Sequence, residues 1–456
     1  MPQYIHANHA LTADGWQSDV QISISDLGRI IAVGAQDRVA THVVALALPA
    51  PVNLHSHVFQ RAMSGLTEQR GPDASDSFWT WRKQMFRFLE QLSPDHIEPI
   101  ARLVFMEMLE AGFGAVGEFH YLHHDMNGQP YANPPEMATC IIAAAQSTGI
   151  GLTLLPVLYQ YGGCDGRALT AGQARFGNTI DGFANLYSGT IAAMADSPDD
   201  FKLGIAPHSL RAVSPDGLNA TINLCPDGPI HMHLAEQIAE IKEVTEALGA
   251  SPPRWLLDNY NIDQRWCLIH ATQMTDAETR DMARTNAVVG LCPITESNLG
   301  DGVFKGTDFL SHGGRIGFGS DSNVHISLFE ELKTFEYSQR LRDHSRAALA
   351  TPEHSTGRVL FDHAAIGGAQ AAGRNSGQIT PGMLADIIGI EADNQWLCNR
   401  SGNTVLDGLV FGGHGQDCIT DVWSAGRHMV QKGRHIHRDK IIRDFIKTIS
   451  RLEQQT

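Results

Sequence analysis

The chain has 456 residues, of which 43% are hydrophobic and 18% charged, as in a globular protein with a large core and room for a smaller second unit. Its formal net charge is -16 at pH 7 and it contains no basic run, which argues against a nucleic-acid partner. No apolar stretch is long enough to span a membrane, and the polar N-terminus carries no signal peptide, so we expect a cytoplasmic protein with no membrane partner.

The cysteines are scattered, odd in number and without a CxxC pair. This usage indicates a reducing compartment and argues against both a disulfide framework and a thiolate metal site. They are Cys140, Cys164, Cys225, Cys267, Cys292, Cys398 and Cys418.

Residues 1–49 are predicted to form short strands of a half-buried antiparallel sheet. Asp19 to Ile24 alternates polar and apolar residues, and Arg29 to Gly34 follows after a turn at Asp26-Leu27-Gly28.

From residue 50 to residue 373, continuous apolar runs alternate with longer helical patterns such as Asp76 to Leu89 and Ile238 to Leu248. Eight such repeats predict a (β/α)8 TIM barrel within the α/β class, with strands buried on both faces. The predicted strands are Val52–His57, Phe113–His120, Gly151–Leu158, Lys202–His208, Pro229–Leu234, Trp266–His270, Val288–Cys292 and Arg315–Gly319.

Two further helices are predicted over Leu328–Arg342 and Thr351–Gly373, after which residues 374–456 return to strand texture at Gly382–Ile390 and Asp421–Ala425. We expect these late strands to lie beside those of residues 1–49, in a small β-sandwich domain built from both chain ends. A terminal helix, Asp439–Leu452, follows them.

Histidines and acidic residues follow several of the predicted barrel strands, and the carboxyl ends of barrel strands gather at one mouth. The residues concerned are His55 and His57 on strand one, His208 on strand four, His233 and Glu236 after strand five, His270 on strand six and Asp321 after strand eight.

This set predicts a site for one divalent metal ion of the zinc type. His55, His57, His233 and Asp321 would supply three nitrogens and one oxygen, leaving a position for water, whose pKa would fall to about 7. Glu236 could then shuttle the water's proton to a leaving nitrogen, and His270 could hydrogen-bond the developing tetrahedral centre. Asp321 could also accept the proton of the water.

Each of these residues taken alone has a structural explanation. Glu236 could be a solvated residue at a helix N-terminus, His270 a buried histidine with its hydrogen bonds satisfied, and Asp321 an N-cap. Their joint placement favours the functional interpretation. His231 alternates with His233 and is predicted to be structural, and Glu118 is predicted to support the site rather than to bridge a second metal.

The HSH of residues 55–57, the HxxE of residues 233–236, His270 and Asp321 resemble the motifs of the amidohydrolase superfamily, in its one-metal deaminase branch. The resemblance covers nearly the whole chain. It implies hydrolytic cleavage of a carbon–nitrogen bond with release of ammonia, zinc as the metal (iron would fit the same ligands), and a homodimer.

Three stretches are more particular: His55 to Met63, Ser77 to Arg82 and Glu118 to His124. They resemble the family that converts N-formimino-L-glutamate to N-formyl-L-glutamate in histidine breakdown. Such a small anionic substrate implies paired arginines, for which Arg82 and Arg211 are the candidates. The family match adds Gln60, Tyr121 and His208 as hydrogen-bonding substrate ligands.

Two alternatives stay open. The same metal site could deaminate a purine, a pyrimidine or another aromatic amine, for which stacking faces would matter more than arginines. The chain could instead be a non-catalytic amidohydrolase-like scaffold, although such proteins usually lose metal ligands and none is missing here.

Overall fold

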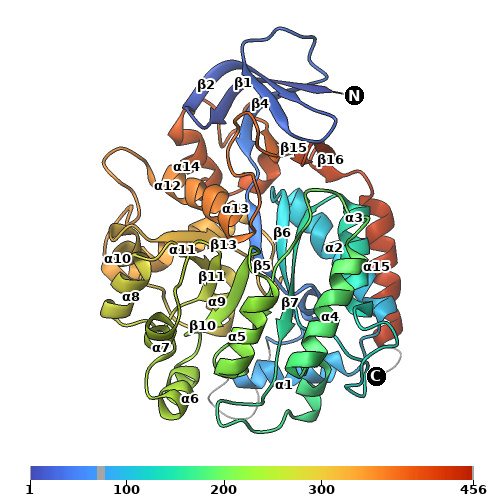
Figure 1. Cartoon of the computed structure of the whole chain (residues 1–456). Coiled ribbons are helices and arrows are strands. Elements are labelled where there is room, and N and C mark those ends of the chain that lie inside the picture. Colours follow the sequence, from blue (N-terminus) through green and yellow to red (C-terminus); the bar gives the residue numbers. More distant parts are fainter. Residues whose placement is uncertain (1, 69–77, 454–456) are drawn as a thin grey trace.

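The computed structural model describes residues 2–68 and 78–453, and shows a parallel barrel capped at one end by a second sheet (Figure 1). Hydrogen bonds give the strand orders β5-β6-β7-β8 and β10-β11-β12-β13, with β9 paired to β7. Two parallel bridges, Ser56 to Asp321 and Ile205 to Ile230, join these halves. The predicted (β/α)8 barrel is therefore confirmed.

The barrel strands lie close to the predicted positions. They are β5 (Val52–Ser56), β6 (Ala115–His120), β7 (Gly151–Leu158), β8 (Lys202–Leu203), β9 (Ala206–Pro207), β10 (Ile230–Leu234), β11 (Trp266–His270), β12 (Val288–Leu291) and β13 (Arg315–Phe318).

Helices and 3-10 turns surround the barrel and connect its strands. They are η1 (Val58–Met63), α1 (Phe78–Leu89), α2 (Pro94–Glu110), α3 (Glu136–Thr148), η2 (Ala171–Phe176), α4 (Ile180–Ala193), α5 (Pro215–Leu224), α6 (Ile238–Leu248), α7 (Pro252–Asn259), α8 (Asp276–Ala283), α9 (Pro293–Leu299), α10 (Gly306–Ser311) and α11 (Leu328–Asp343). Of the predicted helix Asp76 to Leu89, Asp76 and Ser77 lie outside the described residues.

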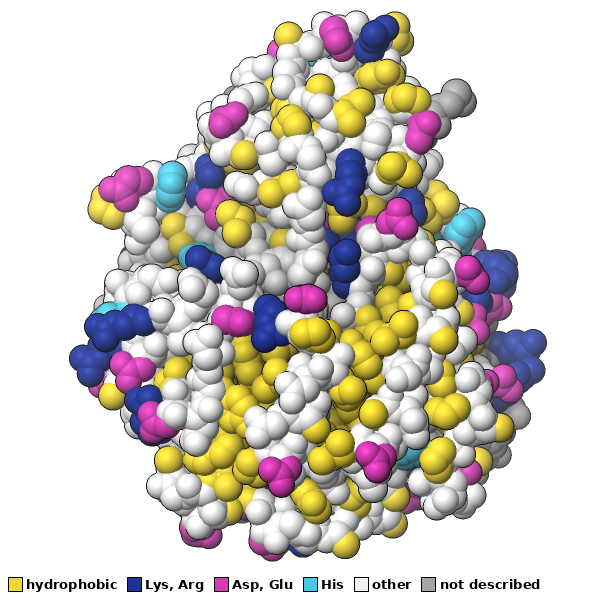
Figure 2. Space-filling view, viewed as in Figure 1, with side chains coloured by type: hydrophobic (Ala, Val, Ile, Leu, Met, Phe, Trp, Pro, Cys, Tyr) yellow, Lys and Arg dark blue, Asp and Glu magenta, His cyan; other side chains and the backbone are white. Residues whose placement is uncertain are grey.

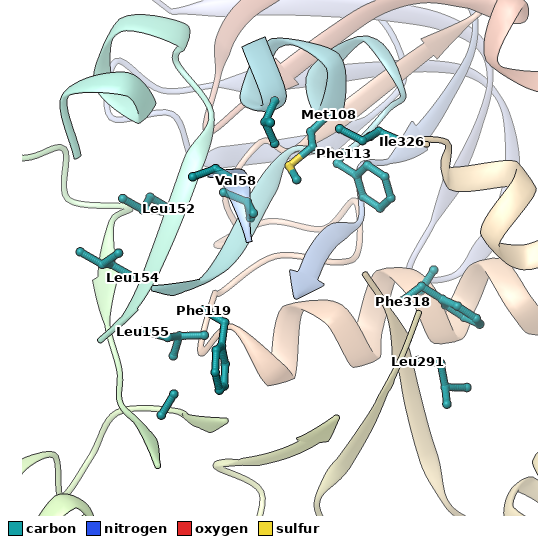
Figure 3. Close-up of a cluster of buried hydrophobic side chains, with 14 of the residues drawn as sticks. Val58, Met108, Phe113, Phe119, Leu152, Leu154, Leu155, Leu291, Phe318 and Ile326 are labelled. Atoms are coloured by element: carbon teal, nitrogen blue, oxygen red, sulfur yellow. The ribbon is translucent and has the colours of Figure 1, made fainter. Parts of the chain in front are cut away.

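The barrel strands are buried on both faces, which explains their unbroken apolar runs. Every residue of β7 is buried, so Leu154 and Leu155, which point to opposite sides of the strand, both lie in the core. Figure 3 shows these leucines in one cluster with Phe119 of β6 and Met108 of α2. Because the barrel interior is filled with such side chains, polar chemistry is confined to its ends.

The fourth barrel strand differs from the prediction. The continuous strand Lys202–His208 is two short pieces, β8 and β9, with Gly204 between them. A Cβ on Gly204 would lie 2.5 Å from the carbonyl oxygen of Pro229, so only glycine allows the approach of the chain that precedes β10.

The predicted helix Thr351–Gly373 is also divided. It forms α12 (Thr356–Asp362), a π-helical turn η3 (His363–Gly367) and α13 (Gly368–Ala371). A Cβ on Gly367 would lie 1.9 Å from the carbonyl oxygen of Ile316 on β13. The widened turn thus lets the backbone of this segment pack directly against the barrel.

Strands from both chain ends lie together, as predicted, and they form one mixed sheet with the order β17-β16-β15-β14-β4-β1-β2-β3. Strand β4 joins the two ends, because it pairs parallel with β1 and antiparallel with β14. These strands are β1 (Gln3–Thr12), β2 (Gly15–Ile24), β3 (Ile30–Gly34), β4 (His42–Pro49), β14 (Ile387–Ile390), β15 (Ile419–Ser424), β16 (Arg427–Gln431) and β17 (Arg434–His435), with α14 (Asn403–Phe411), η4 (Gly415–Cys418) and α15 (Arg438–Glu453) in the same part of the chain.

Figure 1 shows this sheet at one end of the barrel and α1 at the other. On the face shown in Figure 2, the described Lys and Arg side chains are interspersed with Asp and Glu and form no continuous basic surface, in keeping with the acidic composition. Among the helices in the described part of the chain, none has the length and apolar character to traverse a bilayer.

A buried ion network joins the barrel to the sheet. Arg374 donates to both carboxylate oxygens of Asp386 at 2.7 and 2.9 Å and to Asp200 at 2.9 Å, and Arg427 of β16 donates to Asp200 at 2.7 and 2.8 Å. Burial alone would raise the pKa of Asp200, but Arg427 and Arg374 lower it below its usual value.

We predict that Asp200→Asn lowers the free energy of unfolding by about 3 kcal/mol at pH 7, because the arginines lose a buried counter-charge. The folded-state pKa lies below the unfolded value of about 3.9, so the contribution is present above about pH 4 and is lost as the pH falls through the folded value. Denaturant unfolding at pH 7 and pH 3 measures the difference, with exposed Asp199→Asn as the control; an unchanged midpoint at pH 7 would contradict the role given to Asp200.

Candidate metal centre and adjoining pocket

The first and last barrel strands fix three of the predicted ligands against one another through the backbone. The amide of His57 donates to the carbonyl of Asp321, and the amide of Asp321 donates to the carbonyl of His55, both at 2.9 Å. His233 reaches the same point from β10. Strands distant in sequence therefore place these four side chains over one end of the barrel.

Three pairs of ligand atoms lie at separations close to those of a tetrahedral site. The Nε2 atoms of His233 and His55 lie 3.2 Å apart, and Oδ1 of Asp321 lies 3.2 Å from Nε2 of His57 and 3.5 Å from Nε2 of His55. Metal–ligand bonds of about 2.0–2.1 Å give tetrahedral edges of about 3.3 Å. The residues present therefore fit a zinc-sized cation.

His55 and His233 are in the neutral form that metal ligation needs. Burial lowers the pKa of His55 to about 3, and burial together with neighbouring histidines lowers the pKa of His233 well below its usual value. His57 lies 3.0 Å from the carbonyl oxygen of Phe119 through Nδ1, so that nitrogen donates and Nε2 keeps its lone pair for an ion.

Asp321 is held as a carboxylate. Burial alone would raise its pKa, but hydrogen bonds from His55 and His57 lower the pKa well below the usual range. The donor set is thus three imidazole nitrogens and one anionic oxygen, which matches a divalent cation better than a monovalent one.

Backbone strain marks the strand ends that carry the site. Ala235, His270 and Asp321 have φ values of 52°, 68° and 47°, in the left-handed region that non-glycine residues rarely adopt. Each such residue costs about 1–3 kcal/mol, so the surrounding structure must impose it.

A buried amide–hydroxyl network provides part of that support. Asn53 accepts from the amide of Ser320 at 3.1 Å and donates to its hydroxyl at 2.7 Å. That hydroxyl donates to Asn323 at 2.6 Å, and Asn323 donates to Ser56 at 3.1 Å. These hydrogen bonds therefore hold the turn that contains Asp321 against the first barrel strand.

His270 and Glu236 lie beside the ligands. Nε2 of His270 is 3.8 Å from Oδ2 of Asp321, and its Nδ1 is 3.1 Å from Glu296 on α9. Burial alone would lower the pKa of His270, but the carboxylates of Glu236, Glu296 and Asp321 raise it to about 10. Burial raises the pKa of Glu236.

A pocket opens above the ligands, and the predicted site residues line it. They are His57, Gln60, Arg82, Tyr121, His208, Arg211, His233, Glu236, His270 and Asp321. His55 is fully buried and lies outside the lining. His231 and Glu118 were predicted to be structural or supporting residues, and neither lines the pocket. Nε2 of His231 lies 2.7 Å from the carbonyl oxygen of Ala371, and Glu118 accepts from the amide of Val58 at 2.9 Å.

The sequence analysis missed several contributors to this pocket. Trp81, Met85, Tyr159, Phe176 and Leu299 line it as well, and Glu296 holds His270. A scan for polar residues directly after every strand would have found Tyr159, because β7 ends at Leu158. Nothing in the local sequence distinguishes Glu296 from other helical glutamates.

Comparisons with known proteins assign nearly the whole chain to one family. A family model described as "Amidohydrolase family" matches residues 46–429, and one described as "Formimidoylglutamate deiminase HutF, N-terminal domain" matches residues 2–41. The chain is 43% identical over 452 residues to the formimidoylglutamate deiminase of Pseudomonas aeruginosa, covering 98% of this chain and 99% of the other.

Solved structures are also similar. An amidohydrolase from Brucella melitensis has a TM-score of 0.94 at 45% identity, with 99% of both chains covered. An adenosine deaminase from Xanthomonas campestris with bound zinc has a TM-score of 0.83 at 20% identity, covering 99% of this chain and 98% of the other, which shows the same fold.

We predict that His233→Ala weakens zinc binding by more than about 100-fold, because it removes a metal ligand. Loss of a residue that only hydrogen-bonds a ligand costs roughly 10–100-fold. Chelator competition on metal-stripped protein measures the affinity. His231→Ala is the matched control on the same strand and should bind zinc as the wild type does. Equal affinities for His233→Ala and wild type would contradict the ligand assignment.

Proposed function

Because this chain belongs to the amidohydrolase family and carries the N-terminal domain of formimidoylglutamate deiminases, we propose that it hydrolyses N-formimino-L-glutamate to N-formyl-L-glutamate and ammonia. One observation supports this substrate above others: Arg82 and Arg211 line the same pocket as the histidine–aspartate cluster. A single pocket thus offers two cations for two carboxylates beside a centre suited to hydrolysis.

We assign the metal as one zinc ion held by His55, His57, His233 and Asp321, on the chemistry of those donors. When bound, the ion supplies Lewis acidity and makes water a nucleophile near neutral pH.

In the reaction, the oxygen of water bonds to the formimino carbon, the bond from that carbon to the terminal nitrogen breaks, and both protons of water leave with that nitrogen as ammonia. Glu236 is the group that carries a proton from water to nitrogen, because it lines the pocket and burial raises its pKa toward the working range. Protonated His270 donates toward the oxygen that gains charge at the tetrahedral carbon. Asp321 serves as a ligand and as a second acceptor for the proton of water.

The remaining polar residues orient the substrate. Gln60 donates to the Tyr121 hydroxyl at 2.8 Å, and that hydroxyl donates to Sδ of Met85 at 3.7 Å, a weak bond that an oxygen acceptor of the substrate would replace. His208 is held neutral, since burial and the nearby arginines lower its pKa. Bidentate arginine–carboxylate pairs give both affinity and orientation.

The proposal is tested by ammonia release. Protein loaded with zinc should release ammonia from N-formimino-L-glutamate and not from guanine, cytosine or adenine. Release from an aromatic amine alone would favour the aromatic-amine deaminase alternative. Metal binding without release from any of these compounds would favour a scaffold.

We predict that Glu236→Gln lowers kcat by about 10²–10⁴-fold, because glutamine cannot transfer the proton, while the metal content stays unchanged. Coupled ammonia detection at saturating substrate measures this. Glu243→Gln, which alters a carboxylate paired with exposed Arg167, is the control. A kcat within about threefold of wild type would remove Glu236 from the proton path.

For the substrate carboxylates, we predict that Arg211→Ala lowers kcat/KM by roughly 10–150-fold through KM, from the 1.5–3 kcal/mol that a charged hydrogen bond contributes. Arg211→Lys should recover only part of the loss, because lysine cannot form a bidentate pair. Arg167→Ala, at an exposed site, is the control. Unchanged kinetics in Arg211→Ala would place the substrate carboxylates elsewhere.

A further inference from the structure

Glu236 lies in a turn whose backbone is held by a second glutamate, Glu240 of α6. The two carboxylate oxygens of Glu240 accept from the amides of Ala235 and Glu236, at 3.2 and 2.9 Å. Ala235 has a φ of 52°, which a non-glycine residue keeps only where its surroundings impose it. Glu240 therefore fixes the shape of the turn, while the place of the turn over the barrel depends on contacts from other segments.

Asp301, which follows α9, provides such contacts. Its Oδ1 accepts from the side-chain amide of Gln237, the residue after Glu236. Its carbonyl oxygen accepts from the side-chain amide of Gln273, whose backbone amide donates to the carbonyl of Ala235 at 2.9 Å. One residue thus holds the turn of Glu236 on both sides, at positions 235 and 237.

The segment around Asp301 is itself closely defined. Gly300 ends α9 in the left-handed conformation, with a φ of 70°, and the amide of Asp301 donates to the carbonyl of Glu296 at 3.0 Å. Gly302 has a φ of 121°, and a Cβ there would lie 3.1 Å from Nε2 of Gln273. Glycine at this position therefore leaves room for the side chain that Asp301 binds.

Helix α9 also supports the second residue that handles protons. Glu296 of this helix lies 3.1 Å from Nδ1 of His270. Neither Glu296 nor Asp301 is among the described residues that line the pocket. The segment after β12 thus contacts both Glu236's turn and His270 from outside the pocket.

Asp301 is suited to act through its hydrogen bonds rather than as an ion. It is buried, and burial together with the nearby carboxylate of Glu236 raises the pKa of Asp301 to about 8. The carboxyl is therefore mostly neutral at pH 7, and asparagine, with one acceptor oxygen and one NH2 group, resembles that form. Asparagine at position 301 can keep the bond to Gln237, whereas alanine cannot.

Resting on the proposed function, we propose that Asp301 is a positioning residue that holds Glu236 within reach of the proton it transfers. Asp301 acts through Gln237 and Gln273, which place the two sides of the turn. Proton transfer requires hydrogen-bond distance, so a small displacement of Glu236 slows it. Loss of Asp301 should therefore slow turnover without weakening substrate binding.

The test is steady-state kinetics of zinc-loaded Asp301→Ala and Asp301→Asn with N-formimino-L-glutamate. We expect kcat to fall about 10–100-fold in the alanine variant with KM within about threefold, and the asparagine variant to recover most of that loss. Asp308→Ala, which removes a carboxylate near His312 on α10, is the matched control. A wild-type kcat in Asp301→Ala, or an equal loss in both variants, would overturn the proposal.

A double-mutant cycle identifies the residue on which Asp301 acts. Asp301→Ala should add little to the loss in Glu236→Gln, because no proton carrier is left to position. Gln237→Met, which removes the donor to Asp301 at similar size, should reproduce the alanine variant. Additive losses, or a wild-type kcat in Gln237→Met, would contradict the proposal, as would a loss of zinc that parallels the loss of kcat.

Amide hydrogen exchange keeps this proposal distinct from the proposed function, because it needs no turnover. In zinc-loaded, full-length protein, the amides of residues 235–240 should exchange about fivefold faster or more in Asp301→Ala than in the wild type. If the wild type releases no ammonia from N-formimino-L-glutamate, the proposed function fails, whereas faster exchange still supports the role of Asp301 at this turn. Unchanged exchange would contradict that role even when the wild type is active.

Discussion

The structure depends on the convergence of three imidazoles and one carboxylate, in which three pairs of ligand atoms lie 3.2–3.5 Å apart. Burial keeps the pKa of His55 near 3 and that of His233 well below normal, so these rings offer lone pairs and cannot neutralise Asp321 by protonation at neutral pH. Such a set is electrostatically satisfied by a cation at its centre. Ala235, His270 and Asp321 have strained, left-handed backbone conformations at the strand ends, and this strain accompanies the inward orientation of the site.

Charge is divided between two sides of the pocket. Arg82 and Arg211 form a cationic wall in a chain whose formal net charge is -16, and Glu236 with Asp321 forms an anionic wall near the metal centre. The substrate we propose has the complementary charges, because it carries two carboxylates and one basic formimino group. Long-range repulsion of anions by the acidic surface is overcome only where the arginines are close.

Much of this arrangement was predictable because it follows from one geometric rule. Parallel barrel strands place their carboxyl ends at one mouth, so His55, His233 and Asp321 could be brought together from strand order alone. The mixed sheet from both chain ends followed from alternation at Asp19 to Ile24 and from the late return of strand texture.

What could not be predicted depends on contacts between segments that share no local pattern. The break at Gly204 and the π-helical turn at Gly367 arise from backbone approaches to Pro229 and Ile316. Glu296 holds His270, and Tyr159 meets Arg82, through side-chain geometry that periodicity does not encode. Arg82 itself was expected from family resemblance, since a helical arginine beside tryptophans has no distinctive local signature.

The most direct test of the central claim is X-ray absorption at the zinc edge on the zinc-loaded, full-length protein. We predict one zinc per chain with only nitrogen and oxygen neighbours at about 2.0–2.1 Å and the multiple scattering of several imidazoles. Sulfur neighbours at about 2.3 Å, or a shell of oxygens without imidazole scattering, would contradict an ion held by His55, His57, His233 and Asp321.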